Sequence, residues 1–181
     1  MSINTLIYLS LIEYISNLKD TNGNAYFRTV NQDLGQLEIA PKPPVSFPCC
    51  LFDLDTAEWQ TQGAEAQKGV LNIVFRLGFT PFSNSDNLTP ADYRAKAVAY
   101  YDYEEILFKA LQGWCPGDVT GYEPLQDIVG SLMRIRSWTE RRPEDFIRVR
   151  GIHFQTTIDD YSAIKLPTLI QATAAINESF E

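Results

Sequence analysis

Histidine is almost absent from this 181-residue sequence, since His153 is the single one, and there are only three cysteines. Histidine is the usual general base beside a serine or cysteine nucleophile, and it is the commonest metal ligand. Any Ser-His-Asp or Cys-His site would have to use His153, and no Cys/His metal cluster can be assembled. His153 lies within a stretch of strand character, so we interpret it as a strand residue that faces a neighbour.

The common catalytic and nucleotide-binding motifs are also missing. The sequence contains no GxSxG, GxxxxGK[ST], GxGxxG or HExxH pattern. We therefore predict no catalytic residues, no cofactor and no enzymatic activity. A small enzyme or ligand-binding domain stays open as an alternative, and it would need a concave pocket with convergent polar groups.

Long apolar runs and a signal sequence are lacking. Residues 1–20 are rich in Leu and Ile, but they have no basic start and no small-residue cleavage site. No stretch is apolar for long enough to span a bilayer. We expect a cytoplasmic protein with no membrane partner.

Positive charge is scarce. The sequence has 15 Lys and Arg against 23 Asp and Glu, which gives a net charge of -8. Broad nucleic-acid binding needs a basic surface that neutralises phosphates. The balance argues against non-specific nucleic-acid binding, and we predict no sequence-specific nucleic-acid partner.

Hydrophobic residues make up 45% of the chain and charged residues 21%, the balance of a folded domain. The length suits one domain with a core of its own. We predict a single α+β domain over residues 1–181, with a flexible or partner-binding C-terminal tail from about residue 164 that includes a short helix capped by Thr168.

Periodicity places the elements. Apolar residues recur at helical spacing after Ser2, which predicts an N-terminal helix that ends before Gly23. A second helix is predicted from Thr89-Pro90 to Gly113, in the centre of the chain. Strands are expected at residues 25–30, 36–40, 47–62, 70–79, 131–140 and 145–159.

The strands from 47 to 79 form the strongest pattern, a long β-hairpin reversed by the polar residues 63–69. The last two strands are joined by a turn at 141–144. The fold class is therefore α+β: a mostly antiparallel twisted sheet with long β-hairpins, packed against an N-terminal helix and a central helix.

Cys49 and Cys50 are neighbours within the first hairpin strand. Adjacent strand residues point to opposite faces, so the two thiols cannot bind one metal together. Cys115 lies in a distant loop. We predict that Cys49 and Cys50 are reduced, that at least one is buried, and that they serve the core.

Two other groups allow a functional and a structural interpretation. Asp53 and Asp55 share a strand face and could bind Mg²⁺, although paired acids on an exposed strand face are commoner, and we predict no metal site. Tyr100, Tyr101 and Tyr103 could form an aromatic binding box, but at helical spacing such residues are more often core anchors.

Arginine is concentrated near the C-terminal third. Residues 134–150 hold six arginines and three acids, so this segment nets +3 and the remaining chain -11. Alternation puts Arg134 and Arg136 on one face, and Arg148 and Arg150 on one face. These four residues are predicted to form a subunit interface that meets an acidic surface, which favours a head-to-tail homo-oligomer. A solvated sheet face is the alternative.

The order of elements resembles the tail terminator (tail-completion, minor tail) proteins of long-tailed bacteriophages and prophages. The resemblance lies in LIEYISNLKD as the opening helix, in PKPPVSFPCCLFDLD as a proline-led strand, in AEAQKGVLNIVFRLGF as the central strand, and in FIRVRGIHFQTTIDD as the closing strand. It covers most of the chain as an arrangement of elements. The length between residues 113 and 130 and the long C-terminal tail depart from it.

The resemblance implies a structural, non-enzymatic protein that forms a ring, often a hexamer. Such a ring caps the tail tube and provides the surface to which the head docks. The implied partners are identical subunits, the tail tube and head-tail connector proteins. The implied location is the host cytoplasm during assembly and the virion tail afterwards. Another head-tail or baseplate component is an alternative.

Overall fold

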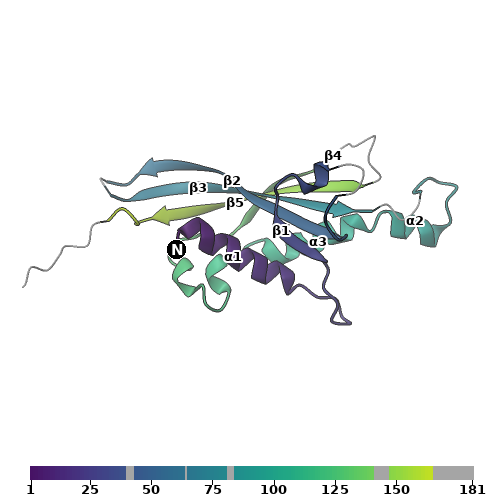
Figure 1. The fold of residues 1–181 in the computed structure, drawn as a ribbon, viewed down its shortest axis with the longest axis horizontal. Coiled ribbons are helices and arrows are strands. Elements are labelled where there is room, and N and C mark those ends of the chain that lie inside the picture. The colour runs from purple at the N-terminus through teal and green to yellow at the C-terminus, as the bar shows by residue number, and fades with distance from the viewer. Residues whose placement is uncertain (40–42, 64, 81–83, 141–146, 165–181) are drawn as a thin grey trace, which may run out of the picture.

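A computed structural model of the chain describes residues 1–39, 43–63, 65–80, 84–140 and 147–164. Within these ranges one five-stranded sheet has the order β1-β2-β3-β5-β4. Helices α1 (Ile3–Ser16) and α3 (Tyr100–Leu111) lie against one face of this sheet (Figure 1). We call this the helix side and the opposite face the outer face. The α+β fold class is confirmed.

The sheet is mostly antiparallel. Its strands are β1 (Thr29–Gln32), β2 (Cys49–Thr61), β3 (Gln67–Phe79), β4 (Met133–Glu140) and β5 (Arg148–Asp160). β1 runs parallel to β2, and each of the other neighbouring pairs is antiparallel. The predicted turn at 141–144 lies outside the described residues, as does the tail from residue 165.

The β2–β3 hairpin is confirmed. The residues of β3 alternate between buried and half-buried from Gly69 to Leu77, as expected for a strand with one face on a core. At the reversal the Gln62 N–H donates to Ala66 O at 2.8 Å, and Gly63 has a φ of 97°. Near this end Trp59 lies so close to Gly69 that a Cβ there would be 2.8 Å from the indole.

Helix α1 (Ile3–Ser16) is confirmed with its cap, since the Ser2 hydroxyl accepts a hydrogen bond from Thr5 N–H at 3.2 Å. Its residues Ile7, Leu11 and Ile15 are fully buried on the helix side of the sheet. The main core combines these with apolar residues of β2, β3, β5 and α3.

The central helix departs from its prediction, because it is two helices, α2 (Ala91–Ala97) and α3 (Tyr100–Leu111). Helical geometry is interrupted at Val98, where φ is -106° and ψ is 4°. Thr89 does not cap α2, since its hydroxyl donates instead to Asp86 at 2.9 Å. α2 has no buried residue, whereas α3 buries Glu104, Leu107 and Leu111.

The two short strands predicted before the hairpin are partly wrong. The first is shifted, since β1 covers 29–32 and not 25–30. The second is the 3-10 helix η1 (Gln36–Glu38), which follows Gly35 at φ 81°. η1 buries Leu37 in a small second core on the outer face, together with Cys49, Leu51 and Val149.

Two more 3-10 helices, η2 (Pro116–Asp118) and η3 (Glu123–Leu125), lie between α3 and β4. Leu125 and Val129 from this region are buried in the main core. Among the described residues, no helix is long and apolar enough to cross a membrane.

Candidate functional site

Three of the four predicted interface arginines lie on the helix side, along α3. Arg134 is opposite the core residue Phe154 in the β4–β5 register, and its guanidinium lies 3.7 Å from the centre of the Phe108 ring. Arg148 lies over the Tyr100 ring at 5.0 Å. Both side chains belong to exposed residues, so both remain candidates for an interface.

Arg150 is different because it is buried. Its Nε donates to Glu104 Oε2 at 2.8 Å, and one terminal guanidinium nitrogen also pairs with that oxygen. The other terminal nitrogen donates to the Thr139 hydroxyl. The two charged side chains are only 11% and 10% exposed. Arg150 is thus engaged in an internal ion pair between β5 and α3.

Arg136 lies on the outer face, so the prediction that it shares a face with Arg134 is wrong. The β4–β5 register shifts between these two residues, which inserts Ile135 as a bulge. A bulge changes which face the following side chains point to. Arg136 is consequently opposite His153, and it lines a shallow pocket with Asp33, Asp53 and Asp55.

A second charged cluster, around Arg76, lies on the outer face and was not predicted from the sequence. Arg76, in the middle of β3, pairs with Asp33 at 3.0 Å, Glu38 at 2.6 Å and Glu140 at 2.7 Å. These carboxylates come from three separate segments. Burial by itself lowers the pKa of Arg76, but hydrogen bonds to the three carboxylates raise it above its ordinary value. One arginine in a strand gives no sequence signal for three distant partners.

Asp53 and Asp55 line the same pocket, of about 310 Å³, on the outer face. Asp53 accepts a hydrogen bond from Gln32 at 3.3 Å. Over the described ranges, no group of three or more His, Cys, Asp or Glu side chains is placed to hold a metal ion.

His153 also faces outward, as a strand residue with a polar neighbour. Its Nε2 lies 2.8 Å from Asn72 Oδ1, which also accepts from Gln155 at 3.1 Å. Burial, followed by the charge of Arg136, lowers the pKa of His153, so the imidazole is neutral at pH 7.

Both adjacent cysteines are fully buried and free, on opposite faces as predicted. Cys50 joins the main core, and Cys49 joins the smaller outer core. Burial raises the pKa of Cys49 from about 9 to about 11, and that of Cys50 well above its ordinary value. These thiols are therefore protonated at neutral pH and poorly nucleophilic.

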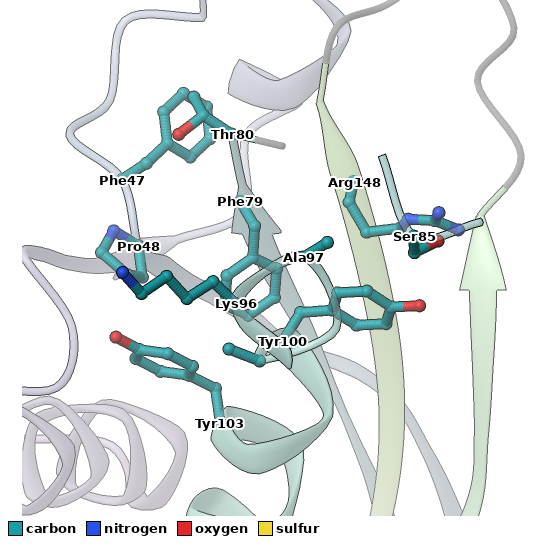
Figure 2. Close-up of a pocket in the computed structure, with 11 residues that line it drawn as sticks. Phe47, Pro48, Phe79, Thr80, Ser85, Lys96, Ala97, Tyr100, Tyr103 and Arg148 are labelled. Atoms are coloured by element: carbon teal, nitrogen blue, oxygen red, sulfur yellow. The ribbon is translucent and has the colours of Figure 1, made fainter. Parts of the chain in front are cut away.

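A pocket that combines aromatic side chains with two cations was not predicted. A pocket of about 210 Å³ lies between the start of β2, the end of β3, the α2–α3 junction and the start of β5. Figure 2 shows Lys96 and Arg148 on either side of Phe79, with the Tyr100 and Tyr103 rings below them. Its walls come from four distant segments, so no local motif could reveal it.

The three tyrosines of α3 divide between core and pocket. Tyr103 packs against Phe27 and Phe79 at centroid distances of 5.9 and 5.3 Å, as a core anchor does. Tyr100 contacts the main core and lines the pocket. Tyr101 is 49% exposed and lies beneath Arg150, so it is not a core anchor.

No family model and no curated protein matches this sequence. One solved structure with a similar arrangement is a chain described as "Virion of native gene transfer agent (GTA) particle". It is 13% identical, it covers 88% of this chain and 96% of its own, and the TM-score is 0.47. A likeness this distant does not bear on the function of the chain.

Proposed function

We propose that this chain is a structural, non-enzymatic subunit of a phage or phage-like particle, and that it assembles into a ring of the tail-terminator type. The observation that carries the proposal is the pair of open sheet edges. Among the described residues β4 pairs only with β5, and β2 beyond residue 52 pairs only with β3. Open edges of this kind are templates for pairing with another chain.

The side chains at one edge favour association. β4 carries Met133 and Ile135 at 51% and 53% exposure, flanked by Arg134 and Arg136. Apolar residues at an open edge supply contact area, and Arg134 orients a partner whose surface is acidic. The rest of this chain is acidic, so a second copy is a suitable partner.

The ring would use the chain's acidity in a second way. A lumen of net negative charge repels the phosphates of DNA, so a passing duplex would slide rather than adhere. In this proposal the ring contacts the tail tube on one side and the head-tail connector on the other. It forms in the host cytoplasm and ends in the virion tail. The likeness to the gene transfer agent chain is too distant to serve as evidence for this proposal.

The test is the mass of the purified chain across protein concentration, measured by light scattering, with negative-stain images of the largest species. We expect a closed ring for the parent. Ile135→Lys should weaken assembly because it places a charge at the edge, whereas Leu88→Lys, at an 87% exposed loop residue, should not. A chain that stays monomeric at all concentrations would contradict ring assembly.

Co-purification tests the specific role. If the ring caps a tail tube, tagged chain should retain tube protein when the two are expressed together. A ring that binds only capsid or baseplate components would contradict the terminator role while leaving the structural role intact.

A further inference from the structure

The pocket of Figure 2 combines two cations with an aromatic floor. Lys96 comes from α2 and Arg148 from β5, and Phe79, Tyr100 and Tyr103 also line the pocket. Its volume of about 210 Å³ has room for one large side chain, not for a folded element. The complementary ligand is an aromatic side chain flanked by carboxylates.

The sequence contains one segment with this chemistry outside the described residues. Residues 178–181 read Glu-Ser-Phe-Glu, so that Phe180 lies between Glu178 and Glu181. The two acids match the two cations in number and in their placement on either side of an aromatic group. We propose that the segment 165–181 of one copy binds the Lys96–Arg148 pocket of a second copy, with Phe180 inserted among the pocket aromatics. This inference rests on the self-assembly proposed above.

The position of the pocket favours a second copy over the same chain. β5 begins at Arg148 in the pocket and runs 13 residues to Asp160, which separates the two ends by roughly 40 Å. In Figure 1 the C-terminal end of β5 and helix α2 lie at opposite ends of the molecule. Sixteen residues link Ile164 to Phe180 and reach at most about 55 Å when fully extended, so an internal return would leave little slack. A head-to-tail neighbour can present its β5 end beside the pocket without that extension.

Charge reversal in the full chain tests this pairing. Lys96→Glu with Arg148→Glu gives a pocket variant, and Glu178→Lys with Glu181→Lys gives a tail variant. Each alone should associate at least tenfold more weakly than the parent in sedimentation velocity at low salt. An equimolar mixture should recover association, because every tail then meets a pocket of opposite charge on the other variant. Lys109→Glu, a 70% exposed α3 position outside the pocket, is the control and should behave as the parent.

A photo-crosslinking residue in place of Phe180 gives a readout independent of assembly strength. We expect crosslinks between chains to peptides that contain Tyr100 or Tyr103. Crosslinks to other surfaces, crosslinks only within one chain, or no recovery in the mixture would overturn the pairing. If rings form normally from both reversed variants, this inference fails while the proposed function stands. If the parent forms neither rings nor crosslinks between chains, both fail.

Discussion

Arg150 Nε donates to Glu104 Oε2 across 2.8 Å, and this pair fastens strand β5 to helix α3 in the interior of the protein. The sequence placed Arg150 beside Arg148 on a common face, which is correct, and assigned both to an interface. Burial separates the two roles, because Arg148 is exposed while Arg150 is not. A substitution of Arg150 therefore tests folding and is unsuited to testing assembly.

Glu104→Ala should destabilise the fold by about 3–5 kcal/mol, since it leaves the buried Arg150 charge without its carboxylate. Urea unfolding of the two proteins measures the difference. The matched control is Glu105→Ala at the next position, where the carboxylate is exposed and pairs with Lys109, so the change should be below about 0.5 kcal/mol. Replacing both buried partners, as in Glu104→Leu with Arg150→Met, should cost less than Glu104→Ala. Equal effects of the two single alanine substitutions would contradict the internal role of the pair.

Gly151→Ala should be strongly destabilising because of a single neighbour. A Cβ at Gly151 would lie 2.1 Å from the Trp138 ring, which covers this glycine from the adjacent strand. Overpacking of this kind typically costs about 1–3 kcal/mol. The cost should largely disappear in a Trp138→Ala background, and a double-mutant cycle in thermal or urea unfolding measures that coupling. If Gly151→Ala costs the same in both backgrounds, the contact does not explain the glycine.

The sequence predicted the hairpins because their signals are local. Alternating apolar residues along 70–79 and a Gly-containing polar reversal fix both strands, and the same alternation gives the opposite orientations of Cys49 and Cys50. The N-terminal helix could be predicted for the same reason, since a capping Ser2 precedes apolar residues at helical spacing.

The errors arise where side chains or bulges override the local pattern. Residues 36–40 alternate like a strand, but the Gln36 side chain accepts from Leu34 N–H at 2.7 Å and Gly35 turns the backbone left-handed. The bulge at Ile135 has no turn residue to announce it, yet it moves Arg136 to the outer face. The Arg76 cluster and the Lys96–Arg148 pocket depend on long-range packing, which one sequence does not encode in any readable motif.

Burial of Cys49 predicts a loss of stability at alkaline pH. Its pKa is about 11 in the folded protein and about 9 ordinarily, so between these values the unfolded chain releases a proton that the folded chain retains. The free energy of unfolding should therefore be unaffected below pH 9 and fall above it, by up to about 1.4 kcal/mol per pH unit from this thiol. Urea unfolding at pH 8, 9 and 10 should give a shallower decline for Cys49→Ala than for the parent. Leu51→Ala, at a neighbouring position of the same small core, should keep the parent's slope. An unchanged slope in Cys49→Ala would contradict the shift.

The bulge at Ile135 makes the interface arginines unequal, and this can be measured. Arg134 and Arg136 point to opposite faces of the sheet, so a single flat contact can include only one of them. Arg136 shares its pocket with Asp33, Asp53 and Asp55, which offset its charge, whereas Arg134 lies beside Phe108 on the α3 side.

We expect Arg134→Glu to weaken self-association at low salt by up to about fivefold per contact, in keeping with the 0–1 kcal/mol of an exposed ion pair. Arg136→Glu should change it less. The difference should shrink at high salt because screening weakens exposed charges. Equal effects of the two reversals in sedimentation velocity, or no effect of Arg134→Glu at any salt concentration, would make the arginines a solvated face and not an interface.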